Sequence, residues 1–93
     1  MLEIRSTCEH CEKKLPNESG EAMICTYECT FCSNCVTNVL MNVCPNCGGG
    51  FEKRPTRPKG GLLESPISKK QVFNPVSKNL FLEKNIDIEP RER

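Results

Sequence analysis

The sequence has little of what a small protein normally uses to build a core. It contains no tryptophan, four phenylalanines, one tyrosine and a single histidine among 93 residues, and only 37% of the chain is hydrophobic. So short and polar a chain buries too little apolar surface to offset the entropy lost on ordering. Domains of this kind are held together by disulfides or metal ions. We therefore expect a cross-linked fold.

Long apolar runs are also missing. The first residues contain Glu3 and Arg5, where a signal peptide would need an apolar stretch. No segment approaches the length of a membrane span. We expect a cytoplasmic protein that does not engage membranes, and because cytosolic thiols stay reduced, the sequence favours metal binding over four disulfides.

What the sequence does contain is eight cysteines within forty residues. Three pairs are separated by two residues, and the fourth pair, Cys25 and Cys29, by three. Cysteines so spaced place two sulfurs on one tight turn, and tetrahedral zinc needs four such ligands. We predict two structural zinc ions as the only cofactors, held by Cys8, Cys11, Cys25, Cys29, Cys32, Cys35, Cys44 and Cys47.

The four pairs can be wired in two ways. Neighbouring pairs could share a metal, or the first pair could join the third while the second joins the fourth. The spacing favours the interleaved arrangement, because a hairpin that runs directly into a helix turns the 25/29 and 32/35 pairs toward opposite sides. Each pair then needs a distant partner, and the long loops so closed cross-link the chain more strongly.

Composition divides the chain into a metal module over 1–51, a basic Pro/Gly linker over 52–61, and a tail over 62–93 that is partly ordered or docked on the module. The module carries a formal charge of −3 and the remainder +4. Two zinc ions held by eight thiolates would bring the module to about −7. Such a module is a poor electrostatic match for nucleic acid.

Local patterns place the elements. Residues 22–31 indicate a hairpin with metal ligands at its tip. Ser33 or Asn34 could cap a following helix, whose apolar stripe is expected to pack on the hairpin and comprises Val36, Val39, Leu40 and Val43. Ser77 could cap one or two further helical turns through Lys84.

The spacing C-x2-C, x13, C-x3-C-x2-C-x2-C, x8, C-P-x-C is similar to the RING cross-brace, with Cys29 where that family usually has histidine. The resemblance implies a small zinc-stapled α+β fold: a hairpin and one short helix, followed by a largely irregular C-terminal tail. Carried over, site one comprises Cys8, Cys11, Cys32 and Cys35. Site two comprises Cys25, Cys29, Cys44 and Cys47.

A closer resemblance extends over residues 1–76. Met1-Leu-Glu-Ile-Arg5, Cys8-Glu-His-Cys11, Ile24 to Cys32, Cys44-Pro-Asn-Cys-Gly-Gly49, Arg54-Pro-Thr-Arg-Pro58 and Val72-Phe-Asn-Pro75 look like the bacterial cysteine-rich family called domain of unknown function twelve seventy-two. That family name implies no activity.

No catalytic set stands out. Four-thiolate zinc leaves no open position for water, and His10, the lone histidine, is expected to be an exposed turn residue. Cys25-x3-Cys29-x-Phe31-Cys32 resembles a radical SAM iron–sulfur signature, but the chain is too short for the barrel that those enzymes require. We therefore expect no enzymatic activity.

Three functions remain open. The first is a protein–protein interaction module whose partner is another protein. The second is a nucleic-acid-binding zinc protein that uses the basic segment, namely Lys53, Arg54, Arg57, Lys59, Lys69 and Lys70. The third is a component of a RING-type ubiquitin ligase. Glu9-His10 inside the first turn, the lack of tryptophan and Gly48 after the last ligand all depart from the ligase pattern.

Overall fold

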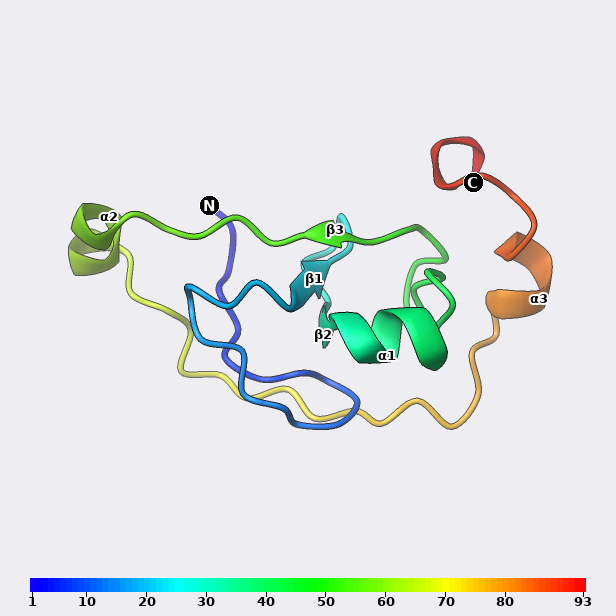
Figure 1. Ribbon diagram of the computed structural model, residues 1–93, viewed down its shortest axis with the longest axis horizontal. Helices are drawn as coiled ribbons and strands as arrows, with labels where there is room; N and C mark the ends of the chain where they lie inside the picture. The colour runs from blue at the N-terminus through cyan, green and yellow to red at the C-terminus, as the bar shows by residue number, and fades with distance from the viewer.

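A computed structural model describes all residues, 1–93. Its centre is a three-stranded antiparallel sheet in the order β2-β1-β3 (Figure 1). Strands β1 (Ala22–Ile24) and β2 (Thr30–Cys32) form the predicted hairpin, with Met23 opposite Phe31. Strand β3 (Glu52–Lys53) adds to the free edge of β1. The small α+β class expected from the sequence is confirmed, and its cysteine clusters are consistent with stapling by zinc.

Helix α1 (Ser33–Asn38) follows β2 without a loop, but it is shorter than the apolar stripe suggested. Cys32 occupies the N-cap position and no side chain caps the helix, so the expected role for Ser33 or Asn34 is wrong. The chain leaves the helix before Val39, which is 38% exposed, whereas Leu40 and Val43 are fully buried beyond the helix end. Positive φ values at Met41 and Asn42 turn the chain back toward the core.

The hydrophobic core is built largely from the cysteines themselves. Twelve buried residues form it, and six of them are cysteines. The remaining members include Phe31 and Phe51, whose rings meet edge to face with centroids 5.5 Å apart. The stability of such a core depends on whatever holds the cysteine sulfurs together.

The start of the predicted linker belongs to the module. Besides forming β3, this segment carries Arg54, which is 1% exposed although it is an arginine. Its guanidinium donates hydrogen bonds to the carbonyl oxygens of Arg5 (2.6 Å), Leu15 (3.0 Å) and Pro16 (2.7 Å). The linker prediction for 52–61 did not anticipate these contacts, because burial of an arginine through backbone carbonyls has no signature in composition.

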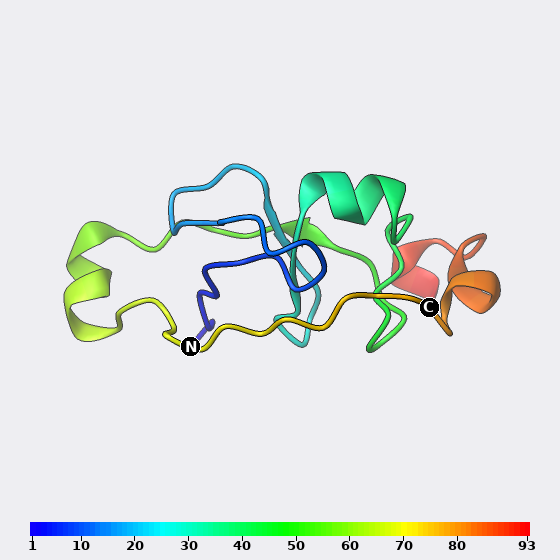
Figure 2. The same cartoon turned by 90° about the horizontal axis from the view of Figure 1, so that it is seen from below.

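The tail lies along the module rather than apart from it (Figure 2). The amide of Asn74 donates to the carbonyl of Glu9 (2.8 Å), and the amide of Val76 donates to Nδ1 of His10 (2.9 Å). His10 lies in a turn, as expected, but it is half-buried rather than exposed and anchors the tail. The sequence could not show this because the two residues are 66 positions apart.

The last part of the tail is hydrogen-bonded to the backbone around the final cysteine turn. The Nδ2 group of Asn79 donates to the carbonyl of Val43 (2.8 Å), and that of buried Asn85 donates to the carbonyl of Gly48 (2.9 Å). Gly48 has φ +78°, and a Cβ there would lie 2.6 Å from Nδ2 of Asn85. Only glycine allows both this turn and this approach. Helix α3 is confined to Leu82–Asn85, so the expected helix from Ser77 begins later than predicted.

Two short elements complete the chain, which is elongated, at 42 × 25 × 18 Å. Helix α2 (Lys59–Glu64) projects at one end, and the 3-10 turn η1 (Pro90–Glu92) lies near the other (Figure 1). The longest helices have six residues, so none is long and apolar enough to cross a membrane.

Candidate metal centres

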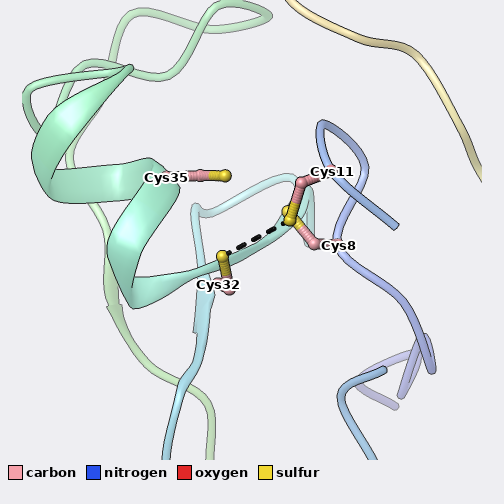
Figure 3. Close-up of side chains that lie close together, drawn as sticks. All are labelled: Cys8, Cys11, Cys32 and Cys35. Atoms are coloured by element: carbon pink, nitrogen blue, oxygen red, sulfur yellow. Dashed lines mark hydrogen bonds between the residues drawn. The ribbon is translucent and has the colours of Figure 1, made fainter. Parts of the chain in front are cut away.

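The first cysteine group joins the N-terminal turn to the start of α1. Sulfurs from Cys8 and Cys11 on that turn point toward those of Cys32, at the end of β2, and Cys35, on the first turn of α1 (Figure 3). All four Sγ atoms lie within 4.8 Å of one another. These are the residues expected for site one, and their grouping confirms the interleaved wiring on this side.

The sulfur separation suits a tetrahedral metal. Zinc–sulfur bonds of about 2.3 Å in a regular tetrahedron place the sulfurs about 3.8 Å apart. The Sγ atoms of Cys11 and Cys32 are 3.7 Å apart. A disulfide would require about 2.0 Å. The donor set and this separation therefore fit a divalent cation bound by thiolates.

The second group joins the hairpin tip to the last cysteine turn. Sγ atoms of Cys25, Cys44 and Cys47 lie within 4.8 Å of one another. Cys29 falls outside that mutual distance, although its thiol hydrogen-bonds to those of Cys25 and Cys44. Three of the four predicted ligands thus meet directly, and the fourth lies beside them.

Every sulfur in the second group accepts an N–H donor. Backbone amides of Tyr27, Asn46 and Gly49 approach Cys25, Cys44 and Cys47 at 3.4 Å each. The side-chain amide of Asn46 reaches Cys29 at 3.3 Å. Donors of this kind stabilise thiolate charge and orient metal ligands. Asn46 therefore links Cys29 to Cys44, a role that the sequence did not indicate.

Crowding and burial shift the pKa values of the thiols. Hydrogen bonds from Cys29, and then Cys44, lower the pKa of Cys25 to about 3. The pKa of Cys44 is raised, first by its hydrogen bond with Cys25 and then by that with Cys29. In the first group, burial is the main cause that raises the pKa of Cys35. Neighbouring sulfurs cannot all ionise without a compensating charge, and a divalent cation would supply it.

Glu9 supports the first turn from inside the protein. It is 3% exposed, and its Oε2 accepts bonds from the amide of Thr30 (2.6 Å) and the guanidinium of Arg5 (2.9 Å). Burial, the largest influence, raises the pKa of its carboxyl. Glu9, which departs from the ligase pattern, thus ties the Cys8–Cys11 turn to β2. The only signal for this role in the sequence was its position between two predicted metal ligands.

The basic residues proposed as a nucleic-acid surface are only partly available. Arg54 is buried against three carbonyls, as described above. Arg57 is half-buried, and its guanidinium donates to the carbonyls of Ser65 (2.6 Å) and Leu2. The remaining four, Lys53, Lys59, Lys69 and Lys70, are exposed. Two of the six expected cations therefore serve the fold.

Comparisons with known proteins confirm the family resemblance. The model of a family described as Protein of unknown function (DUF1272) matches residues 1–57. An uncharacterized protein, R02474, of Rhizobium meliloti (strain 1021) is 49% identical over 75 residues, which cover 81% of this chain and 89% of the relative. No solved structure matches the chain.

Proposed function

We propose that this chain, which belongs to the DUF1272 family, is a non-catalytic protein that binds two zinc ions and serves as a protein–protein interaction module. The observation that carries the proposal is the gathering of the cysteines into two groups built from interleaved turns. All the donors are sulfurs, which suit zinc. A site with four thiolates leaves no position for a substrate or a reactive water, so the metal would be structural.

Metal content tests the first part of this proposal. We expect two zinc ions per chain by elemental analysis of protein purified without added metal. Cys8→Ser and Cys32→Ser should each remove the same ion, whereas Cys25→Ser and Cys44→Ser should each remove the other. One zinc per chain, or iron accompanied by visible absorbance, would contradict the two-site assignment.

The tail offers the surface for a partner. Its backbone is held at Asn74 and Val76, yet large apolar side chains on either side remain exposed, with Phe73 at 54% and Leu80 at 75%. Apolar residues on a docked, ordered segment can bind a partner without the entropic cost of ordering that segment. Two of the six cations needed for the nucleic-acid alternative are already used by the fold, which favours a protein partner.

A paired substitution tests the partner surface. In quantitative capture from host lysate by zinc-loaded protein, Phe73→Ser combined with Leu80→Ser should weaken retention of the specific partner by at least about tenfold, as expected when central apolar contacts are lost. Tyr27→Ser is the control, because Tyr27 is 73% exposed at the hairpin tip. Equal capture by the double variant and the native protein would place the binding surface elsewhere.

A further inference from the structure

Residues 57–66 form a loop whose two ends are held together by one side chain, and we call it the Arg57 loop. Arg57 begins the loop and donates to the carbonyls of Ser65 (2.6 Å) and Pro66 (3.5 Å) at its end. Helix α2 lies within the loop. Figures 1 and 2 both show it at one end of the molecule, away from α1 and α3. The base of the loop is thus fixed while its tip meets solvent.

Helix α2 is poorly stabilised within the single chain. It has six residues, no side-chain cap and no buried residue. Isolated helices below about 12–15 residues are marginal in water and depend on packing of an apolar face. Gly60 and Gly61 weaken it further. Of its two leucines, Leu62 is only half-buried and Leu63 is 87% exposed, so α2 has no apolar face packed against the rest of the chain.

An apolar hollow opens beside α2 at the same end of the chain. Its volume is about 310 Å³, and it is lined by Met1, Leu2, Ile4, the segment 55–58 and Gly61. Met1 on its rim is 94% exposed. A protruding leucine and an apolar hollow side by side on one surface are the elements of a self-complementary contact about a twofold axis.

The charges of α2 are self-complementary as well. The helix begins with Lys59 and ends with Glu64, and both are exposed. Neither belongs to the ion pairs of the structure, which are Arg5 with Glu3 and Glu9, and Lys13 with Glu21. In two antiparallel copies, Lys59 of one helix would face Glu64 of the other at both ends. No atom lies within 4 Å of where a Cβ of Gly60 would be, so the helices can approach closely.

We propose that the Arg57 loop is a self-association surface through which two copies of this chain pair with their α2 helices antiparallel. Leu63 of each copy enters the apolar hollow of the other, and Lys59 pairs with Glu64 of the second copy. The leucines supply most of the affinity, because exposed ion pairs contribute little. The ion pairs set the antiparallel direction.

Sedimentation velocity of the zinc-loaded full chain between about 10 µM and 1 mM tests the proposal, a range suited to the weak contact expected of a small interface. The native protein should shift from monomer to dimer across this range. Leu63→Asp should lower the association constant by at least about tenfold, since it removes the central apolar anchor. Tyr27→Asp, at a side chain that is 73% exposed and lies outside the loop, should dimerise normally.

A charge exchange tests the direction of pairing. Lys59→Glu should weaken the dimer about three- to tenfold by placing like charges together at both ends, and Lys59→Glu combined with Glu64→Lys should restore it. A native protein that stays monomeric throughout, or a Leu63→Asp variant that dimerises like the native protein, would overturn the proposal. So would failure of the double exchange to recover what the single exchange loses. Zinc content, measured on the same samples, separates these outcomes from a failure of the metal assignment.

Discussion

We expect that removing the two proposed zinc ions will unfold residues 1–57 and detach the tail. Half of the twelve core residues are cysteines, so without metal half of the core consists of thiols that no longer hold the turns together. Structural zinc contributes roughly 10–16 kcal/mol in zinc-finger peptides. The whole stability of a typical domain is only about 5–15 kcal/mol. The metal-free chain is therefore expected to lack a stable fold.

Hydrogen exchange before and after chelation measures this effect. The amides of Asn74 and Val76 should lose protection together with the core, because their acceptors, Glu9 and His10, lie on a cysteine turn. Adding zinc back in excess of the chelator is the control and should restore protection. A chelated protein that retains protected amides in β1 and β2 would show that the fold does not depend on metal.

Replacement of Arg54 by methionine should destabilise the metal-loaded protein by about 3–5 kcal/mol, because carbonyls of Arg5, Leu15 and Pro16 lose their donor and each unsatisfied group costs about 1–3 kcal/mol. Burial lowers the pKa of Arg54, and no carboxylate pairs with it. The methionine variant no longer has to desolvate a buried charge, and this offsets part of the loss in stability. The expected loss is accordingly below the sum of three such penalties.

Chemical denaturation at constant zinc concentration checks this value. Lys53→Met is the matched control, since its side chain is exposed and surface substitutions usually stay within about 0.5 kcal/mol. Arg54→Lys should recover only part of the loss, because an ammonium cannot reproduce the fork that reaches three carbonyl oxygens at once. If Arg54→Met and Lys53→Met were equally stable, the buried guanidinium would contribute nothing net to the fold.

The metal groups could be predicted because their signal is local and repeated. Two cysteines on one turn are brought together by that turn alone, and the direct passage from Cys32 into α1 decides which side each pair faces. The hairpin and the helix were predicted from local residue patterns, the helix from its apolar stripe. The position of Cys29, which sits apart from the three sulfurs that meet, depends on packing beside Asn46 and was not visible in the sequence.

The boundary of the module was harder to predict. A basic stretch rich in proline and glycine resembles a linker, yet Lys53 pairs with Met23 in the sheet and Arg54 fills the interior. Composition records that a residue is charged, whereas burial depends on whether carbonyls from distant loops converge on it. The division of the chain into module, linker and tail remains a prediction.

By itself, the sequence predicted that the chain is cross-linked, that the eight cysteines supply the links, and which cysteine pairs lie together. These predictions rest on amino-acid composition and on the short spacings between the two cysteines of each pair. Only the tertiary structure decided that Arg54 is internal, that His10 and Gly48 hold the tail, and that α2 stands exposed at one end. Each of these contacts joins residues far apart in the chain, and its geometry exists only once the core has brought the backbone groups into place.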